Sequence, residues 1–486
     1  MHGSVRWIWA DRLCLALLYV WLIWLPLPFG SNVPGAFLPL VATPLALCAA
    51  ASTIRLLATR HRATMPQMTR AWAIWSCGAA LLLLAILLQL IPLPAPLLRL
   101  LSPESQTIWS AATNVAHLGG VAVSSAHPIS VDPPATALEW FRLAALVAAF
   151  QTAVLLVRTH TRRMVLAMII CATALFELFY GVRAAALHRY AIWGWENKLI
   201  FNRVTGTFVN PNHFAHYVAL ALPLALFIGA MAWYESAPAG TPFFRRLVRM
   251  FESRLVPFGG AVVTVVGCLA AILLAQSRGA LLAAAAGVLV TGSLFPGGRV
   301  WRVAFALVAG LLVLGGLIAL LGPERTIERF KPNDSEQSTF VGRRIGFEAA
   351  ARIWSRFSIF GSGAGTFERV VSMEQREDVG KTYHRAHNDY MELAATTGSL
   401  GIVIALVTLA GGYAALVRMT IGKESGDLIR ARRVYQAAAL ASLTIAMVHS
   451  LYDFNFFIPA NPATLAVIVG AAVASLDHDK RTRRSS

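Results

Sequence analysis

The sequence predicts an all-α, polytopic membrane protein that crosses the bilayer about 12 times. Of its 486 residues, 57% are hydrophobic and only 14% are charged, whereas about a quarter of the residues of a soluble domain are charged. The mean hydropathy is +0.61. Many apolar runs also reach the roughly 20 residues that a helix needs to cross a hydrocarbon core, and they lack the alternation expected of strands.

The predicted spans are residues 13–29, 33–52, 71–92, 137–157, 164–183, 213–233, 257–275, 278–294, 301–321, 387–417, 433–452 and 459–476. Arg6 and Arg12 precede the first span, as basic residues do in a signal peptide, but LPLPFGSNVPG after it offers no small-residue cleavage site. We therefore expect a retained anchor and a single integral membrane domain over 1–486.

The net charge of +18 is explained by the positions of Lys and Arg. They gather in alternate connections, at 55–70, 158–163, 245–254, 299–302 and 423–433, and in the C-terminal KRTRR. Cytoplasmic connections carry such an excess, so both termini are predicted to be cytoplasmic. Because the charge is spread over short connections, no nucleic-acid partner is expected.

The five cysteines show no metal-ligand spacing and are expected to be small apolar residues within the spans. On the outer face the longer connections are 93–136, 184–212 and 322–386. Connections beyond about 15 residues are usually functional or disordered. In the third, GRRIGFEAAARIWSRFSIF has apolar residues at helical spacing, which predicts an amphipathic helix starting near Arg343 and Arg344. GSGAGTF, at 361–367, follows a helix and lacks the dinucleotide spacing, so we interpret it as a flexible turn.

Polar residues that could carry chemistry fall on this same outer face. They are Arg203 and His213 around GTFVNPNHF, Arg278 in QSRGALL, the helix residues Arg343 and Arg344, His387 and Asn388 in HRAHNDYMEL, and Asp453 in HSLYDFNFF. Each has a structural explanation as well. His387 and Asn388 suit the first turn of a helix, on which His384, His387 and Met391 would share a face. Arg278 suits a hairpin tip, and Asp453 an aromatic turn at the membrane interface.

Together these residues favour a reaction on a lipid-linked diphosphate. Guanidinium groups bind phosphate oxygens in a bidentate manner, and histidine is the usual general base near neutral pH. We expect an acceptor hydroxyl, deprotonated by a histidine, to displace a polyprenyl diphosphate from a sugar carbon. Arginines would stabilise the charge of the leaving group. The scheme requires no metal and no other cofactor.

The segment HNDYMELAATTGSLG resembles the signature of the bacterial O-antigen ligase and polymerase family. GTFVNPNHFA, SRGALL and GRR…F…GSGAGTF also resemble blocks of that family, in the same order, so the resemblance covers about 203–461. It implies a fold of about 12 helices with a large periplasmic loop between spans 9 and 10, at 322–386. It places the catalytic base at His387 and diphosphate-binding arginines at Arg278 and Arg343, with Arg344 as a rival. Ser358 stands where the family usually has proline, so the register of Arg343 stays open.

The resemblance further implies an enzyme of the bacterial inner membrane whose active site faces the periplasm. The donor would be a glycan on undecaprenyl diphosphate, and the acceptor either the lipid A core, for a ligase, or a growing O-antigen or exopolysaccharide, for a polymerase. Ligase and polymerase are not separated by the sequence. A transporter or flippase of lipid-linked glycans remains an alternative, as does a non-catalytic assembly partner.

Overall fold

The computed structural model describes residues 2–60, 67–189, 191–196, 203–238, 240–295, 310, 334–374, 384–422 and 426–475. These ranges are mostly helical, which confirms the all-α class. Eight helices are long and apolar enough to cross a membrane. They are α1 (His2–Trp24), α2 (Phe37–Arg60), α3 (Arg70–Leu88), α6 (Pro133–Leu156), α7 (His160–Ala186), α8 (Pro211–Glu235), α10 (Leu255–Leu274) and α16 (Asp389–Thr420).

Three further helices coincide with predicted spans: α11 (Arg278–Leu294), α17 (Asp427–His449) and α18 (Ala460–Val473). The ninth predicted span, 301–321, lies outside the described residues except for Gly310. The structure thus supports a polytopic helical protein, and the count of 12 spans stays a prediction.

The remaining elements lie in the connections between these helices. They are α4 (Ala95–Leu101), α5 (Pro103–Leu118), α9 (Phe243–Ser253), α14 (Asp334–Arg356), α15 (Phe367–Glu374), the 3-10 turns η1 (Phe29–Ser31), η2 (Pro34–Ala36) and η3 (Asn455–Phe457), and two antiparallel strand pairs, β1 (Leu93–Pro94) with β2 (Ala126–His127) and β3 (Ala191–Ile192) with β4 (Trp195–Glu196).

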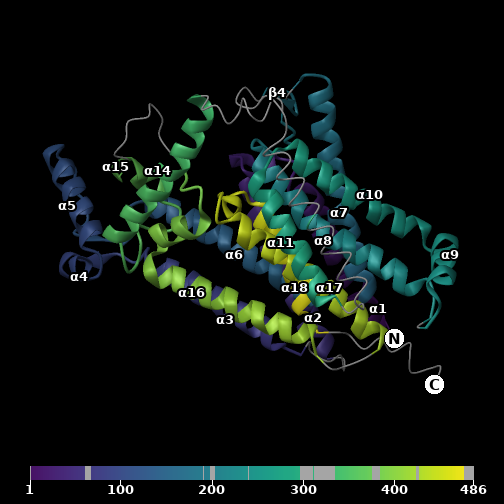
Figure 1. The fold of residues 1–486 in the computed structure, drawn as a ribbon. Coiled ribbons are helices and arrows are strands. Elements are labelled where there is room, and N and C mark those ends of the chain that lie inside the picture. The colour runs from purple at the N-terminus through teal and green to yellow at the C-terminus, as the bar shows by residue number, and fades with distance from the viewer. Residues whose placement is uncertain are drawn as a thin grey trace.

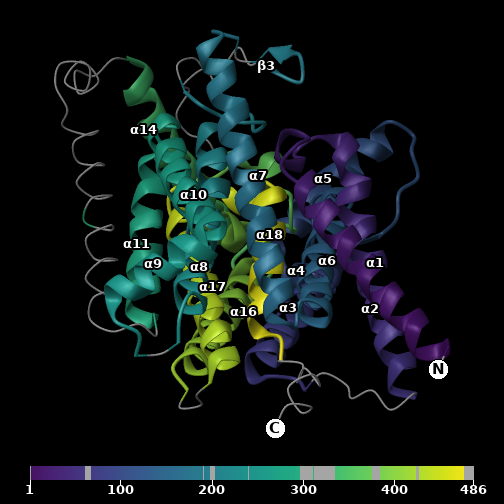
Figure 2. The same cartoon turned by 90° about the vertical axis from the view of Figure 1, so that its right-hand side faces the viewer.

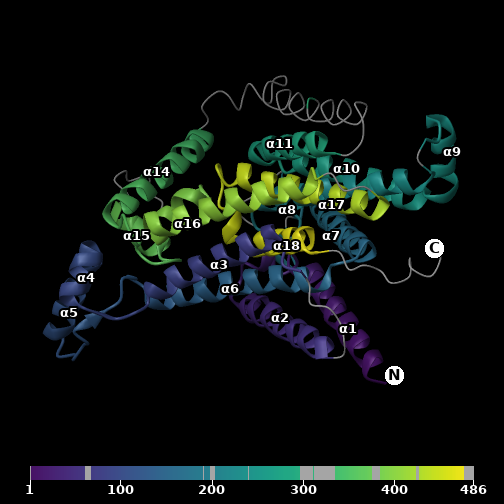
Figure 3. The ribbon, with the colours of Figure 1, turned by 90° about the horizontal axis from the view of Figure 1, so that it is seen from below.

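The helices α4, α5, α14 and α15 gather at one end of the bundle, which we call the loop end (Figures 1 and 3). The start of α1 and helix α9 lie at the opposite end. Figure 2 shows the bundle from another side, with α14 and β3 near the top of the view. The predicted outer connections 93–136 and 322–386 therefore meet in space, in the parts that the structure describes.

Helix α8 forms the centre of the bundle. Of its apolar window 89% is buried, and it packs against α7, α10 and α17. On one side of α17 lies α11, and on the other side α16, which runs along α3. Alanine-rich faces on α8, α11 and α17 let these helices approach closely, as small residues do in membrane proteins.

Helix α16 is broken at Gly398, whose φ of +67° is left-handed. The break lets Ser399 N donate to Ser358 O at 2.8 Å and Leu400 N to Ile359 O at 3.1 Å. Gly361 packs against the backbone at Thr396, leaving no room for a side chain. The predicted flexible turn at 361–367 is therefore a buried turn that fastens the end of α14 to α16. The interpretation as a flexible turn was wrong because the sequence does not show the tertiary partner.

Candidate functional site

His387 lies immediately before a helix and not within its first turn. Helix α16 begins at Asp389, and Asn388 is its N-cap, with its side chain accepting from Met391 N at 3.0 Å. His387 has a φ of +53°, a left-handed conformation that is uncommon for residues other than glycine. His384 lies away from it and pairs with Glu368 at 2.9 Å on the surface. The predicted helical face of His384, His387 and Met391 is therefore wrong, whereas the capping role of Asn388 is confirmed.

Asp453 brings two of the predicted histidines together. His387 Nδ1 lies 3.5 Å from Asp453 Oδ1, and His213 Nε2 lies 3.6 Å from this oxygen atom. The other oxygen, Oδ2, accepts from Asn212 Nδ2 at 2.9 Å. The ring of Phe454 lies edge-on to both histidines, with centroid distances of 4.9 Å to His387 and 4.6 Å to His213. Three segments far apart in the sequence thus meet at one carboxylate.

The surroundings of Asp453 keep its carboxylate ionised. Burial alone would raise its pKa, but the donor nitrogens that His213 and His387 direct at it lower the pKa more, and the net pKa lies well below its usual range. The two nitrogen–oxygen distances are longer than an ordinary hydrogen bond. Such contacts often shorten only when a substrate is bound.

Direct bonds hold the start of α16 against the turn after α17. Asp389 N donates to Ser450 O at 3.0 Å, and Asn388 Nδ2 donates to Leu451 O at 3.1 Å. Asp389 Oδ2 accepts from Phe456 N at 3.2 Å. The positions of His387 and Asp453 are consequently fixed relative to one another by backbone contacts.

A buried carboxylate supports the backbone before His387. Glu392, which is fully buried, accepts from Arg385 Nη1 at 2.7 Å and from Ala386 N at 2.9 Å. Both bonds are charge-assisted at the carboxylate and therefore strong. Glu392 thus fixes Arg385 and Ala386, the two residues that precede the left-handed residue His387.

Arg278 lies at the tip of the hairpin between α10 and α11. It is the first residue of α11 and is exposed, and it forms no hydrogen bond or ion pair with the described residues. The next residue, Gly279, packs against the ring of His449, so Arg278 borders the histidine cluster. An exposed, uncompensated arginine at this place can meet an anion without losing an internal partner.

Arg203 supports that hairpin. Its Nε donates to Ala275 O at 2.9 Å, and its Nη2 donates to Asn212 Oδ1 at 3.2 Å. The guanidinium therefore links the turn before Arg278 with the asparagine that contacts Asp453. In this structure Arg203 is a positioning residue, and the sequence offered no sign of these carbonyl partners.

The structure separates Arg343 from Arg344. Arg343 Nε is buried and has no hydrogen-bond partner within the described ranges, and the charge of Arg343 acts on the His449 ring. The Arg344 side chain is 56% exposed and lies 3.6 Å from Glu348. Arg343 thus has a buried guanidinium nitrogen without a partner in the described ranges, whereas Arg344 has an acidic partner on its own helix.

Behind this cluster lies a second pair of histidines, His216 and His449. Both are fully buried, and their Nδ1 atoms are 3.0 Å apart. One ring must donate and the other accept, so both rings cannot be protonated at these atoms. Between the described residues, no group of three or more His, Cys, Asp or Glu is arranged as a metal site.

Glu177 is a polar residue that the sequence reasoning missed. It is fully buried on α7 and accepts from Thr207 N at 2.7 Å and from Thr207 Oγ1 at 2.9 Å. It thereby anchors the loop that carries Arg203 and leads into α8, where His213 lies. A lone carboxylate inside the apolar run ATALFELFYG was the available signal, because ionisable residues within spans are rare and often functional.

Residues 263–406 match the family model described as O-antigen ligase. Over these residues the match confirms the predicted resemblance to the O-antigen ligase family. The O-antigen ligase region contains Arg278, Arg343 and His387, whereas His213 and Asp453 lie outside the matched residues. No curated protein sequence matches the chain.

Proposed function

We propose that the protein transfers a glycan from undecaprenyl diphosphate to an acceptor hydroxyl, with His387 as the general base. The observation that carries the proposal is the contact of His387 Nδ1 with the ionised Asp453 carboxylate at 3.5 Å. The O-antigen ligase match supports transfer of a glycan as the reaction class. The enzyme is an O-antigen ligase or an O-antigen or exopolysaccharide polymerase.

The carboxylate of Asp453 sets the protonation of His387. A carboxylate beside Nδ1 favours the tautomer that keeps the proton on Nδ1, so Nε2 has a free lone pair. The Phe454 ring limits rotation of the imidazole. When Nε2 takes the proton of the acceptor hydroxyl, Asp453 stabilises the resulting imidazolium, as a carboxylate does in other His-based sites.

Two arginines are placed to bind the donor diphosphate. Arg278 is exposed at the hairpin tip and borders the histidine cluster through Gly279, and Arg343 on α14 has a buried Nε without a partner in the described ranges. Departure of undecaprenyl diphosphate concentrates negative charge on the leaving group. Guanidinium groups at fixed positions stabilise this charge without rearranging during the reaction. His213 and Asn388 support the site by holding Asp453 and the start of α16.

The loop end faces the periplasm in this proposal, with the protein in the inner membrane and both termini in the cytoplasm. The basic connections predicted to be cytoplasmic include 245–254. This connection overlaps α9, which lies at the end opposite to the loop end. His387, Arg278 and Arg343 are then reached from the compartment in which lipid-linked glycans are assembled further.

The deciding experiment is a transfer assay with purified protein in detergent. It uses an undecaprenyl-diphosphate glycan as donor, with lipid A core or a lipid-linked repeat unit as acceptor, and follows the product by gel shift. We expect wild-type protein to transfer the glycan and the His387→Ala variant to lose at least about 100-fold in rate. His384→Ala is the matched control, because His384 is exposed and pairs with Glu368.

The acceptor that shifts distinguishes a ligase from a polymerase. Equal transfer by wild type and a folded His387→Ala variant would remove His387 as the base. Donor binding without transfer to any acceptor would favour a transporter of lipid-linked glycans.

A further inference from the structure

A basic amphipathic helix, α9 (Phe243–Ser253), connects the central helix α8 to α10 at the end opposite to the loop end. Both neighbouring helices are long and apolar enough to cross a membrane. Figures 1 and 3 show α9 running across the direction of α10. A helix that lies across the ends of membrane spans is placed at the interface between hydrocarbon and water.

One side of α9 is fixed to the end of α8. Met250 is fully buried, and Arg246, one turn before it, is 9% exposed. The Arg246 guanidinium donates to Trp233 O at 3.3 Å and to Pro238 O, and it lies 5.8 Å from the centroid of the Trp233 ring. Phe243 packs on the same tryptophan, with ring centroids 5.3 Å apart. The rotation of α9 is therefore set, and its other faces point in fixed directions.

The side of α9 away from α8 is apolar and exposed. Phe244, Val248 and Phe251 are 79%, 56% and 53% exposed within the protein, and their spacing of i, i+4 and i+7 places them along one face. Phe244 and Val248 precede Arg246 and Met250 by two positions, which is about 200° around the helix. This apolar row thus points away from the docked side. A contiguous row of large exposed apolar side chains marks a surface that another apolar phase covers.

Two cations form the neighbouring row of α9. Arg245 and Arg249 follow Phe244 and Val248 by one position, lie one helical turn apart and are exposed. Neither guanidinium forms a hydrogen bond or an ion pair with the residues that the structure describes. The exposed surface of α9 therefore combines an apolar row with free positive charge.

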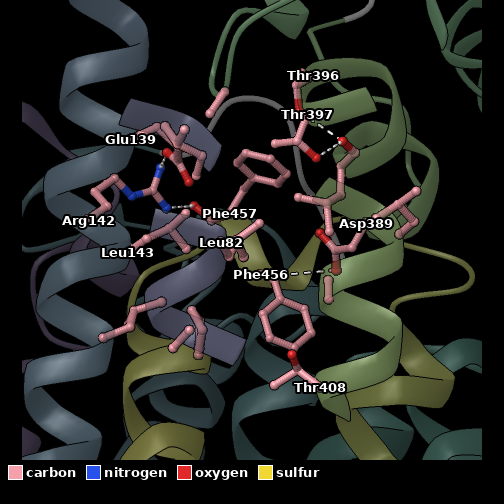
Figure 4. A pocket seen from close by; sticks show the side chains of 18 of the residues that line it. Leu82, Glu139, Arg142, Leu143, Asp389, Thr396, Thr397, Thr408, Phe456 and Phe457 are labelled. Carbon is pink, nitrogen blue, oxygen red and sulfur yellow. Dashed lines mark hydrogen bonds and ion pairs between the residues drawn. The ribbon is translucent and has the colours of Figure 1, made fainter. Parts of the chain in front are cut away.

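Other arginines show how a compensated cation differs from these two. Arg254, directly after α9, pairs with Glu235 at 3.2 Å. Arg142, in the wall of the apolar cavity between α3, α6 and α16, pairs with Glu139 at 3.1 Å and donates to Phe457 O at 3.0 Å (Figure 4). The exposed cations of α9 have no such partner in the described ranges, so they can bind an external anion without losing an internal bond.

An apolar row beside two free cations is complementary to an anionic phospholipid. Acyl chains would cover the aromatic rings, and the phosphate would lie at the level of the guanidinium groups, which bind phosphate oxygens in a bidentate manner. Long cationic side chains reach from the edge of the hydrocarbon to the headgroups. The exposed apolar surface also continues onto α10, where Leu255 and Val256 are 52% and 84% exposed. This continuity with a membrane-spanning helix favours lipid over a soluble acidic protein.

We infer that α9 is a binding site for anionic phospholipid, with Arg245 and Arg249 holding the headgroup and the row from Phe244 to Phe251 covered by acyl chains. Burial of apolar side chains alone would not distinguish anionic from zwitterionic lipids, whereas two cations attract net negative charge. The inference is independent of the proposed reaction, because no candidate site residue lies on α9.

The first test measures the lipid preference of delipidated full-length protein in detergent. Phosphatidylglycerol or phosphatidylcholine is titrated in, and bound lipids are counted by native mass spectrometry. A basic residue near an anionic headgroup contributes about fivefold in affinity. We expect the Kd for phosphatidylglycerol to rise about fivefold in Arg245→Gln and in Arg249→Gln and about 25-fold in the double variant, with phosphatidylcholine binding within about twofold of wild type.

Two controls accompany this titration. The Arg245→Lys, Arg249→Lys double variant keeps both charges and should retain most of the preference. Arg430→Gln removes a charge that Asp427 already compensates at 3.2 Å, so it should leave the Kd within about twofold. Size-exclusion chromatography and thermal unfolding verify that each variant is folded. An unchanged Kd for phosphatidylglycerol in the folded glutamine double variant would overturn the inference.

The second test locates the lipid on α9. The photo-reactive residue p-benzoylphenylalanine replaces Phe244 or, as the matched control, Ser253, which is exposed nine positions later and about 180° around the helix. Full-length protein is irradiated in bacterial membranes and then analysed by gel and by mass spectrometry. We expect adducts with the mass of an anionic phospholipid at position 244 and not at position 253. A crosslink from position 244 to another polypeptide would assign the apolar row to a protein partner, and the inference would fail. Neither test requires glycan transfer, so a failure of the proposed function would leave both results interpretable.

Discussion

Replacing Asp453 by asparagine tests the central contact of the proposed mechanism. The substitution keeps the shape of the side chain and removes its charge. At 3.5 Å and an effective dielectric constant of about 20, the attraction between an imidazolium and a carboxylate is about 5 kcal/mol. The amide dipole retains part of it. A loss of roughly half, about 2.5 kcal/mol, lowers kcat roughly 50–100-fold.

The assay is glycan transfer at saturating donor and acceptor, so that kcat is measured separately from binding. Asp427→Asn is the control, since this carboxylate is 94% exposed and pairs only with Arg430 within the described part of α17. An exposed pair of this kind contributes little, so kcat should stay within about twofold. A folded Asp453→Asn protein with kcat within about threefold of wild type would refute the reasoning. A raised donor KM with unchanged kcat would instead make Asp453 a substrate-binding group.

Three further predictions concern the cations, the backbone and the dependence on pH. Arg278→Lys should lower kcat/KM at least about tenfold in the transfer assay, because an ammonium cannot replace a bidentate guanidinium. Arg344→Lys is the control and should leave kcat/KM unchanged. Equal losses in the two variants would contradict the assignment of Arg278 to diphosphate binding. Gly398→Ala should lower the free energy of unfolding by roughly 2–4 kcal/mol in detergent, because the φ of Gly398 is +67° and a Cβ there would lie 2.2 Å from Ile359 O. An unchanged unfolding temperature would contradict the described break in α16. The depressed pKa of Asp453 means that its ionisation stabilises the fold above its unfolded pKa of about 3.9, and that this contribution is lost as the pH falls through its lower folded pKa. Wild type should therefore exceed Asp453→Asn in unfolding temperature at pH 7 and lose this advantage on acidification, and a difference independent of pH would oppose the assignment.

The orientation of the protein is a fifth, separate prediction. A reporter enzyme active only in the periplasm, fused after Ala350 in α14, should be active because α14 belongs to the loop end. The same reporter fused after Arg249 in α9 should be inactive. The reverse pattern would invert the topology derived from the basic connections.

The sequence predicted the class of fold because hydrophobic length and composition report directly on the solvent around each segment. Of the candidate residues, the structure brings His387, His213 and Asp453 together at one carboxylate. What could not be predicted is pairing across distant segments. The sequence does not show that Asn212 donates to Asp453, or that Arg203 binds the carbonyl groups of Ala275 and Gln276.

Backbone conformation was the other limit. HRAHNDY gave no sign that the chain turns left-handed at His387 before the helix begins, since histidine does not favour that region as glycine does. The separation of Arg343 from Arg344 likewise depended on the rotation of α14 against α16, which neighbouring positions in a sequence do not reveal. Glu177 was different, because a carboxylate in an apolar span could have been noticed.

The left-handed backbone at His387 has a consequence for how this position can vary. A non-glycine residue there costs about 1 kcal/mol or more relative to glycine, and the bonds from Glu392 to Ala386 and Arg385 hold the chain in that conformation regardless. Glycine would therefore give a more stable protein with no imidazole at the site. Screens that select variants for thermal robustness alone should therefore favour glycine at this position over the proposed base.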